Sequence, residues 1–207
     1  MNIACLPLGE YGANCYVLTE DETKTALVID PGVPSEELND ALLGYNLKSI
    51  LLTHGHFDHI FGCKALKEIY PDAKIYIHSA DEGCLESNDL NLAGDFEETP
   101  GVAADIAVNN GDIIEFADTC FYVLNTPGHS PGSVCYVDNN NKIIFSGDTL
   151  FCLTVGRTDF ARGSFDDMME SIKKLSEFDD EFTVFPGHNR STTIGFERKR
   201  NRYMRKL

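Results

Sequence analysis

The chain has 207 residues, of which 43% are hydrophobic, and a formal net charge of −16 at pH 7. These values fit one globular domain with its own core, and the negative charge argues against binding of nucleic-acid phosphates. No apolar run approaches the roughly 20 residues that span a bilayer, and the N-terminus lacks the features of a signal peptide. We therefore expect a single domain over 1–207, located in the cytoplasm, without nucleic-acid or membrane partners. The sequence leaves the oligomeric state open.

The first half of the chain alternates between strand and helix patterns. Runs of β-formers bounded by turns predict strands at 2–8, 14–19, 25–29, 48–52 and 74–77. Apolar residues at helical spacing predict helices at 35–45 and 60–70, the second of which ends before Pro71. Residues 79–111 show little periodicity, and we expect 88–101 to form a loop over the active site.

The second half of the chain repeats this alternation. The strands predicted there are 113–116, 120–124, 134–137, 142–145 and 182–185. Helices are predicted at 164–175 and at about 194–206. Strands followed by helices, twice over, predict an α+β fold in which two sheets lie between helices.

Seven cysteines are scattered along the chain. Their odd number and the absence of any CxxC pair disfavour both a disulfide framework and a cysteine–zinc site. We expect most of them to be small apolar residues of the core.

Three of the six histidines fall within six positions of the segment LLTHGHFDHIFG. His54, His56, Asp58 and His59 directly follow a predicted strand, where a loop can turn all four side chains inward. Imidazole and carboxylate groups are common ligands of zinc and iron. Gly55 relieves backbone crowding between two of the histidines. The segment therefore predicts a metal site.

Three further candidate ligands also come just after predicted strands. They are His129 in TPGHSPG, Asp148 in FSGDT and His188 in FPGH. Ligands at neighbouring strand ends predict an active-site rim. His78 also ends a predicted strand, but no companion ligand surrounds it, so we expect a structural role. A non-enzymatic structural site is disfavoured because such sites are normally closed by four ligands.

The motifs THGHFDHIFG, NTPGHSPGS, FSGDTLF and VFPGH resemble those of the metallo-β-lactamase-fold hydrolases. Within that superfamily the chain is most similar to the glyoxalase II-like (hydroxyacylglutathione hydrolase) group, in its compact bacterial form. The resemblance extends over nearly the whole chain. It implies a four-layer αββα sandwich with the metals at one edge of the sheets.

The resemblance also implies a role for each candidate residue. The implied ligands of the first metal are His54, His56 and His129, and those of the second are Asp58, His59 and His188. Asp148 would bridge the two metals. Asp30, in the segment IDPG, would support the ligating histidines from behind, and Arg157 would bind the substrate.

The chemistry implied is hydrolysis of a small-molecule thioester such as S-lactoylglutathione, or of an ester. Two divalent ions share a water and lower its pKa, and the resulting metal-bridging hydroxide attacks the carbonyl. Zinc is the expected ion, and iron or manganese would suit the same ligands. Asp58 would also orient the hydroxide, which makes it the candidate catalytic residue.

Two departures from the glyoxalase II pattern keep other activities open. The chain ends soon after His188, without the longer helical extension that helps to grip glutathione, and 158–160 do not reproduce the usual aromatic partner of Arg157. Persulfide dioxygenases share the fold and a Gly-Arg-Thr-Asp-Phe stretch. The residues that would hold their single iron are His54, His129 and Asp148. A lactonase, a β-lactamase or a phosphodiesterase on the same scaffold is the other alternative.

The last 18 residues are basic, with seven lysines and arginines against Glu197 alone. We expect either a solvated helix paired with the acidic body of the protein, or a surface with a role in binding. Such a surface would be an anion-attracting rim beside a pocket, or a subunit contact.

Overall fold

The first half of the chain forms a six-stranded sheet in the order β1-β2-β3-β4-β5-β6. The structure is a computed structural model, and it describes residues 1–94 and 100–207. β1, β2 and β3 pair antiparallel, whereas β3 to β6 pair parallel. The strands are β1 (Asn2–Leu8), β2 (Ala13–Glu20), β3 (Thr25–Ile29), β4 (Asn46–Leu51), β5 (Lys74–His78) and β6 (Ile106–Val108).

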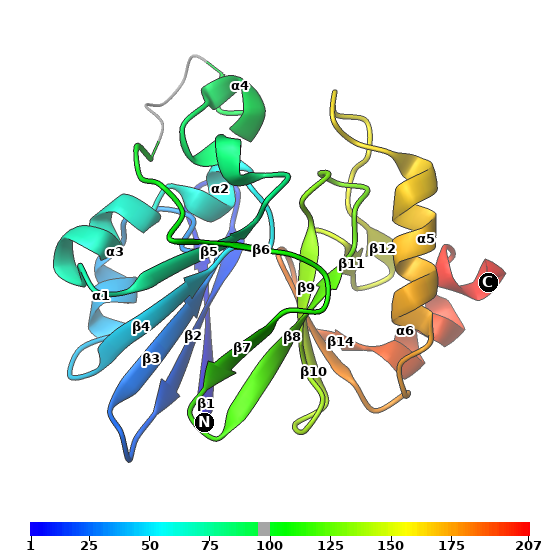
Figure 1. The fold of residues 1–207 in the computed structure, drawn as a ribbon. Helices are drawn as coiled ribbons and strands as arrows, with labels where there is room; N and C mark the ends of the chain where they lie inside the picture. Colours follow the sequence, from blue (N-terminus) through cyan, green and yellow to red (C-terminus); the bar gives the residue numbers. More distant parts are fainter. Residues whose placement is uncertain (95–99) are drawn as a thin grey trace.

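The second half forms another six-stranded sheet in the order β14-β13-β10-β9-β8-β7. Its strands are β7 (Ile113–Phe116), β8 (Thr119–Asn125), β9 (Val134–Asp138), β10 (Ile143–Gly147), β13 (Thr183–Pro186) and β14 (Thr192–Thr193). A small hairpin joins β11 (Leu150–Phe151) to β12 (Thr154–Val155). Figure 1 shows the two sheets facing each other.

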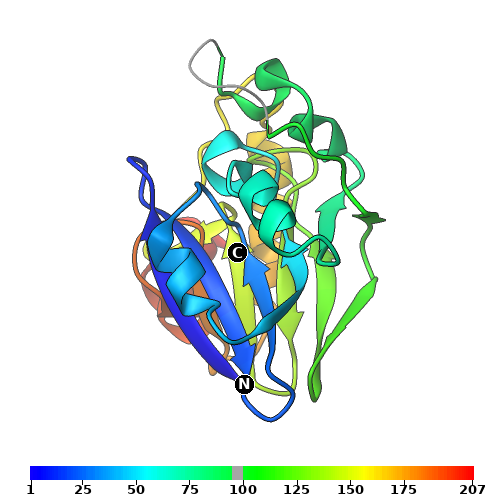
Figure 2. The same ribbon diagram turned by 90° about the vertical axis from the view of Figure 1, so that its left-hand side faces the viewer.

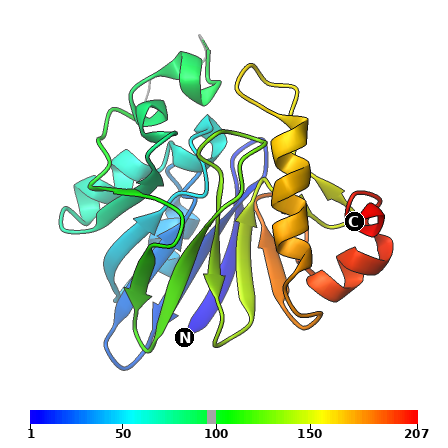
Figure 3. The same cartoon turned by 45° about the vertical axis from the view of Figure 1, so that its right-hand side comes forward.

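Helices cover the outer face of each sheet. α1 (Glu36–Ala41) and α3 (Cys63–Ile69) lie over the first sheet, as Figure 2 shows. α5 (Phe165–Ser176) and α6 (Ile194–Arg200) lie over the second, with α5 in front in Figure 3. The shorter helices are α2 (Phe57–Ile60), η1 (Glu82–Leu85), α4 (Asn88–Asn91) and η2 (Met204–Lys206). The predicted four-layer αββα sandwich is confirmed.

The alternation of side chains along β2 shows how the layers are held together. Tyr16 and Leu18 point into the apolar cluster between the two sheets. Cys15 and Val17 point the other way, into the cluster beneath α1 and α3. Successive side chains of a strand face opposite sides, so a strand that is buried on both faces carries apolar residues throughout.

Four of the seven cysteines are buried core residues, as expected. Cys15, Cys63 and Cys84 belong to the outer cluster of the first sheet, and Cys135 belongs to that of the second. Burial raises the pKa of Cys84 to about 11 and that of Cys135 to about 12. These thiols are therefore protonated and unreactive at neutral pH.

The helix predicted at 60–70 begins later, at Cys63, as α3, and Phe61 and Gly62 separate it from the short helix α2, which was not predicted. The backbone N–H of Gly62 donates to the carbonyl of Pro31 at 2.6 Å. A Cβ at position 62 would collide with that same carbonyl. The break lets the chain pack against the turn that follows β3, and the sequence pattern alone does not reveal this contact. The helix predicted at 35–45 is also shorter, since α1 ends at Ala41.

The predicted C-terminal helix at 194–206 is likewise divided, into α6 and η2. Asn201 leaves the helical conformation, with φ −73° and ψ 123°. Its side-chain amide donates to the carbonyl of Thr154 at 3.0 Å and to Glu197 at 2.9 Å. These buried hydrogen bonds tie the segment to the β11–β12 hairpin and end the helix early.

Residues 79–111 contain more structure than predicted. They form η1, α4 and the edge strand β6, whose three residues carry too little pattern to be recognised. Residues 95–99 of the predicted loop 88–101 lie outside the described residues. Within the described part of the chain, no helix is long and apolar enough to cross a membrane.

Strand β2, near the start of the chain, contacts the segment at the end of β13. The Asn14 amide and the Tyr16 hydroxyl both donate to the carbonyl of Pro186, at 2.9 and 2.6 Å. The backbone of Asn14 donates to Gly187 at 2.7 Å, and Ala13 forms an isolated bridge with His188. The second strand of the chain therefore supports the loop that carries its last candidate ligand.

Candidate metal centre

All seven candidate ligands follow the carboxyl ends of strands, five of them on loops and two, Asp58 and His59, on the short helix α2. Four come after β4, and the others follow β8, β10 and β13. Because β10 and β13 run parallel and β8 has the same direction, these loops share one edge of the second sheet, next to the loop after β4. The structure brings all seven side chains together at this edge.

One set of ligands, the histidine group, consists of His54, His56 and His129. One ring nitrogen from each lies within 4.8 Å of the others. His56 Nδ1 is 2.8 Å from His129 Nε2. All three side chains are buried. Three imidazole nitrogens at this spacing can coordinate one cation.

A second set, the mixed group, consists of Asp58, His59 and His188, whose ligand atoms also lie within 4.8 Å of one another. Asp58 Oδ2 is 3.3 Å from His188 Nε2 and 3.7 Å from His59 Nε2. This group adds a carboxylate to two imidazoles and suits a second cation.

Asp148 lies between the two groups. Its Oδ2 is 3.4 Å from His129 Nε2 in the histidine group and 3.7 Å from His188 Nε2 in the mixed group. Its Oδ1 is 3.6 Å from His59 Nε2. One carboxylate therefore reaches ligands of both groups, as a bridging ligand would.

The hydrogen bonding of the cluster fits a bound cation. Within residues 1–94 and 100–207, His54 Nε2, His59 Nε2 and Asp148 Oδ1 are buried without a hydrogen-bond partner. Buried polar atoms are nearly always paired, and three exceptions in one cluster need a common explanation. Cations held by the two groups would provide partners for all three atoms.

Two side chains of the histidine group, His54 and His56, have lowered pKa values. Burial, together with His59 and His56, holds the pKa of His54 well below its usual value. Burial and the adjacent His129 lower the pKa of His56 to about 3. At neutral pH these rings are therefore unprotonated, which is the form that binds metals.

The mixed group has the opposite electrostatics. Burial lowers the pKa of His59, but the carboxylates of Asp58, Asp30 and Asp148 outweigh burial and raise this pKa to about 10. Burial likewise opposes the shift of His188, whose pKa is raised by its hydrogen bond to Asp58 and by Asp148. The pKa of Asp58 is lowered because His59 and His188 outweigh its burial.

Asp30 contacts the ligand cluster through Thr53 and His59. Its carboxylate accepts hydrogen bonds from the backbone and hydroxyl of Thr53, at 2.8 and 2.7 Å, and lies 3.0 Å from His59 Nδ1. This contact turns Nε2 of His59 toward Asp58 and Asp148. Asp30 also lies near His54, but its oxygens are already engaged in these contacts. Asp30 therefore contacts a candidate ligand, and its supporting role stays a prediction.

Two glycines allow the ligand loops to pack closely. A Cβ at Gly187 would collide with Asp148 Oδ1 and would lie 2.9 Å from Cε1 of His59. A Cβ at Gly55 would lie 2.5 Å from Cβ of Cys84. Gly55 is therefore required by its contact with a distant segment, in addition to the crowding between histidines that the sequence suggests.

Five of the seven candidate ligands line a cavity of about 890 Å³, and His54 and His59 lie buried behind them. Apolar side chains and two arginines also line the cavity. The apolar residues are Pro7, Tyr11, Phe57, Leu92, Phe151 and Phe160, and the arginines are Arg157 and Arg190. This volume is in the range of small-molecule sites.

Arg157, the predicted substrate contact, lines the cavity but is already engaged. Its guanidinium forms two hydrogen bonds to Asp159, at 2.9 and 3.0 Å, and lies 4.5 Å from the ring centre of Phe160. The ring of Phe160 in turn contacts those of His56 and His129. Phe160 is therefore an aromatic neighbour of Arg157, although the sequence pattern differs from the usual one.

The basic C-terminal segment contributes to both of its expected roles. Arg198 and Lys199 form ion pairs with Asp180, which is consistent with a helix paired to the acidic body. Arg190, however, lines the cavity and forms part of its rim.

His78 lies outside both ligand groups, in agreement with its expected structural role. Its Nδ1 accepts a hydrogen bond from Ala80 N–H at 3.1 Å, and the ring is buried. Sequence analysis missed Asp81, three residues farther on, which contacts two of the ligand loops. Its position just after a strand at the same sheet edge is the signal that could have identified it.

The chain matches the model of the metallo-beta-lactamase superfamily over residues 8–188. The Haemophilus influenzae protein named hydroxyacylglutathione hydrolase GloC is 34% identical over 220 residues, which cover 99% of this chain and 98% of that relative. The solved structure of BLEG-1 B3 metallo-beta-lactamase has a TM-score of 0.92 and 34% identity, and covers 98% of this chain and 99% of its own.

TTHA1623, solved in a di-iron-bound form, has a TM-score of 0.84 and 33% identity, with 97% and 99% of the two chains covered. These matches extend over almost the whole length of each protein. They agree with the two-sheet sandwich described above. The chain therefore belongs to the metallo-beta-lactamase superfamily.

Proposed function

We propose that this protein is a dinuclear metal-dependent hydrolase that cleaves thioesters such as S-lactoylglutathione, as a glyoxalase II does. The observation that carries the proposal is the pair of ligand groups, joined by Asp148, beside one cavity. The similarity to the Haemophilus influenzae hydroxyacylglutathione hydrolase GloC supports the choice of substrate.

The donor set supports zinc as the resident ion. The histidine group would hold one ion, the mixed group the other, and Asp148 would bind both. Imidazole and carboxylate ligands also suit iron and manganese. The di-iron form of the similar protein TTHA1623 supports iron as the main alternative.

The side chains around the cavity supply the other requirements of hydrolysis. Two divalent ions, when bound, provide a water of lowered pKa and a polarised carbonyl. Asp58 has a partly exposed carboxylate that lines the cavity beside His188, where it can orient the attacking water through a hydrogen bond. A thiolate leaves without a strong general acid, because thiols have a pKa of roughly 8.5.

The walls of the cavity suit a substrate with an apolar part and an anionic part. Phe57 and Phe151 offer apolar surface close to the ligands, where an acyl group would lie. Arg157 and Arg190 lie where carboxylates of the thiol carrier would be attracted. The ring of Phe160 positions the Arg157 guanidinium through a cation–π contact.

The test is a panel of substrates with purified, zinc-loaded protein. We expect anaerobic turnover of S-lactoylglutathione, with weaker activity or none toward a lactone and a β-lactam. The β-lactam is included because BLEG-1 is a B3 metallo-beta-lactamase. Turnover of the β-lactam alone would replace the proposal with β-lactam hydrolysis. Oxygen consumption by iron-loaded protein with glutathione persulfide, without thioester turnover, would replace it with a persulfide dioxygenase.

A further inference from the structure

Asp81 is a completely buried carboxylate that lies next to the metal centre without belonging to it. It comes three residues after β5, and its carbonyl accepts the N–H of Cys84 at 2.9 Å as η1 begins. A buried carboxylate is unfavourable unless hydrogen bonds and opposite charge compensate it. The groups that compensate Asp81 come from the loops that carry metal ligands.

The two oxygens of Asp81 accept hydrogen bonds from different donors. Oδ2 accepts the backbone N–H of Gly55 at 3.1 Å and the hydroxyl of Ser130 at 2.5 Å. Oδ1 accepts the backbone N–H of Gly132 at 3.1 Å. Gly55 separates His54 from His56, and Ser130 follows His129. A single side chain therefore joins the two loops that supply the histidine group, although one belongs to each half of the molecule.

The two loops are packed against Asp81 as closely as glycine permits. A Cβ at Gly132 would lie 2.6 Å from Cγ of Asp81 and 2.7 Å from its Cβ. A Cβ at Gly55 would lie 3.1 Å from the Asp81 carbonyl oxygen. This fit leaves the loops little freedom to move relative to each other while Asp81 is present.

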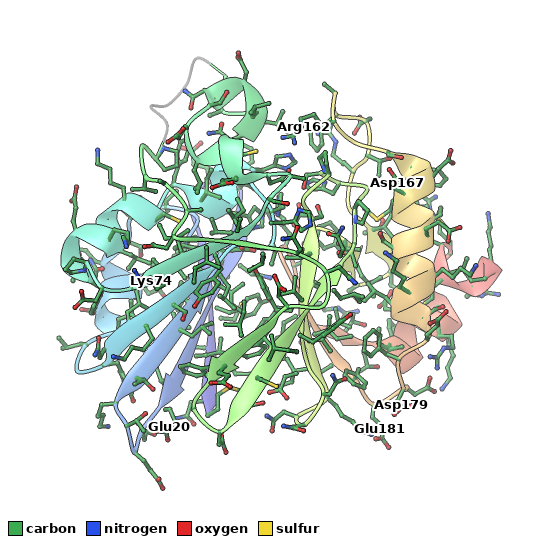
Figure 4. The ribbon with its side chains drawn as sticks, in the orientation of Figure 1. Glu20, Lys74, Arg162, Asp167, Asp179 and Glu181 are labelled. Atoms are coloured by element: carbon green, nitrogen blue, oxygen red, sulfur yellow. The ribbon has the colours of Figure 1, made fainter. Side chains whose placement is uncertain are left out.

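Arg162 completes the arrangement from a third loop. Its guanidinium lies 3.4 Å from Asp81 Oδ1 and donates to the carbonyl of Ala80 at 2.6 Å. Figure 4 shows Arg162 between the η1 segment and the loop that leads into α5. The same loop carries Arg157 and Phe160, so Asp81 also links the cavity wall to the ligands.

We propose that Asp81 is the positioning residue of the histidine group, which holds the His54–His56 loop and the His129 loop at the separation that one metal ion requires. Asparagine at this position has a single acceptor oxygen. Its amide would face either the N–H of Gly55 or that of Gly132, so one loop would lose its anchor. Substitutions that disturb the support of metal ligands typically weaken metal binding about 10- to 100-fold.

The test compares Asp81→Asn with Asp138→Asn in the full chain. Asp138 is equally buried and accepts four hydrogen bonds from Thr119, Asn140 and Asn141, but it lies at the opposite end of the second sheet. Zinc affinity is measured by competition with a chromogenic chelator, and thermal unfolding of the metal-free proteins is followed in parallel. The absorption spectrum of cobalt-loaded protein reports the ligand geometry.

We expect both variants to lose stability, and only Asp81→Asn to bind zinc about 10- to 100-fold more weakly and to change the cobalt spectrum. Equal zinc affinity in Asp81→Asn and Asp138→Asn would overturn the proposal and leave Asp81 a structural residue. If Asp81→Asn does not fold, Ser130→Ala decides, because it removes one of the same hydrogen bonds. It should weaken zinc binding several-fold, and wild-type affinity in Ser130→Ala would overturn the proposal.

This inference rests on the ligand assignment of the proposed function, but its readout is metal binding and not turnover. A wild-type protein that binds zinc and hydrolyses no thioester would contradict the proposed function alone. A wild-type enzyme whose Asp81→Asn variant retains both zinc affinity and the cobalt spectrum would contradict the role of Asp81 alone.

Discussion

The histidine group and the mixed group share one cavity and one bridging carboxylate, yet their electrostatics are opposite. Burial keeps His54 and His56 unprotonated at neutral pH, whereas three carboxylates keep His59 protonated. A cation finds free nitrogen ligands in the histidine group but has to displace a proton from the mixed group. The two ligand groups are therefore inequivalent, and mutation or pH should affect metal binding to each of them separately.

The largest effect is expected when the mixed group is disabled. Asp58→Ala and His59→Ala should each reduce kcat/KM for S-lactoylglutathione by at least about 100-fold. Substitution of residues that only support metal ligands already lowers activity by about 10- to 100-fold, and loss of a ligand itself should have a larger effect. Circular dichroism should show that the fold is intact. Near-normal turnover by either variant would mean that the histidine group suffices, and the dinuclear mechanism would be wrong.

Metal content should separate the two groups directly. After dialysis against zinc, elemental analysis should find two ions per wild-type chain and one in Asp58→Ala, because the histidine group does not depend on Asp58. His129→Ala is the reciprocal variant, in which the mixed group remains complete. A loss of both ions from Asp58→Ala would show that the two positions fill only together.

The pH dependence of metal binding should also differ between the groups. The pKa of His56 is about 3, so protons compete with metal for this ring only in strong acid. The pKa of His59 in the metal-free protein is about 10, so at pH 7 its proton has to leave, and affinity should rise with pH up to that value. Calorimetry in two buffers of different ionisation enthalpy should therefore detect proton release on filling the mixed group only. Equal proton release by both groups would contradict the assigned electrostatics.

The smallest effect is expected outside both groups, at Arg157. Arg157→Gln should raise KM about two- to fivefold with kcat and metal content unchanged, because Arg157 is exposed and water and salt screen the attraction of its charge for a substrate carboxylate. Arg157→Lys, which retains the charge, is the matched control. A fall in kcat or in metal content would show that Arg157 acts on the metal centre through Phe160.

The sequence predicts the layers and the ligand cluster because both depend on local patterns. Strands and their turns are read from short segments, and a ligand just after a strand is placed at a sheet edge wherever that strand lies. His129, Asp148 and His188 are brought to the loop after β4 in this way, although they are distant in sequence.

Features set by distant contacts could not be predicted. The break before α3 depends on the Pro31 carbonyl, and the early end of α6 depends on Thr154. The hydrogen bond between Asp81 and Ser130 joins residues that are 49 positions apart in the sequence, and the one between Arg162 and Ala80 joins residues that are 82 positions apart. No periodicity within either segment encodes such a partner.

The hydrogen bonds from β2 to Pro186 have a consequence for how the protein is made. They join residues 172 and 170 positions apart. β2 therefore cannot form these hydrogen bonds until the ribosome has added the residues up to Pro186. At roughly 5–20 residues per second, this delay is on the order of ten to thirty seconds. His188 is made after the other six candidate ligands, so the mixed group of the nascent chain is incomplete until then. The histidine group is complete once His129 has been made, so the two groups become able to bind a cation at different stages of synthesis.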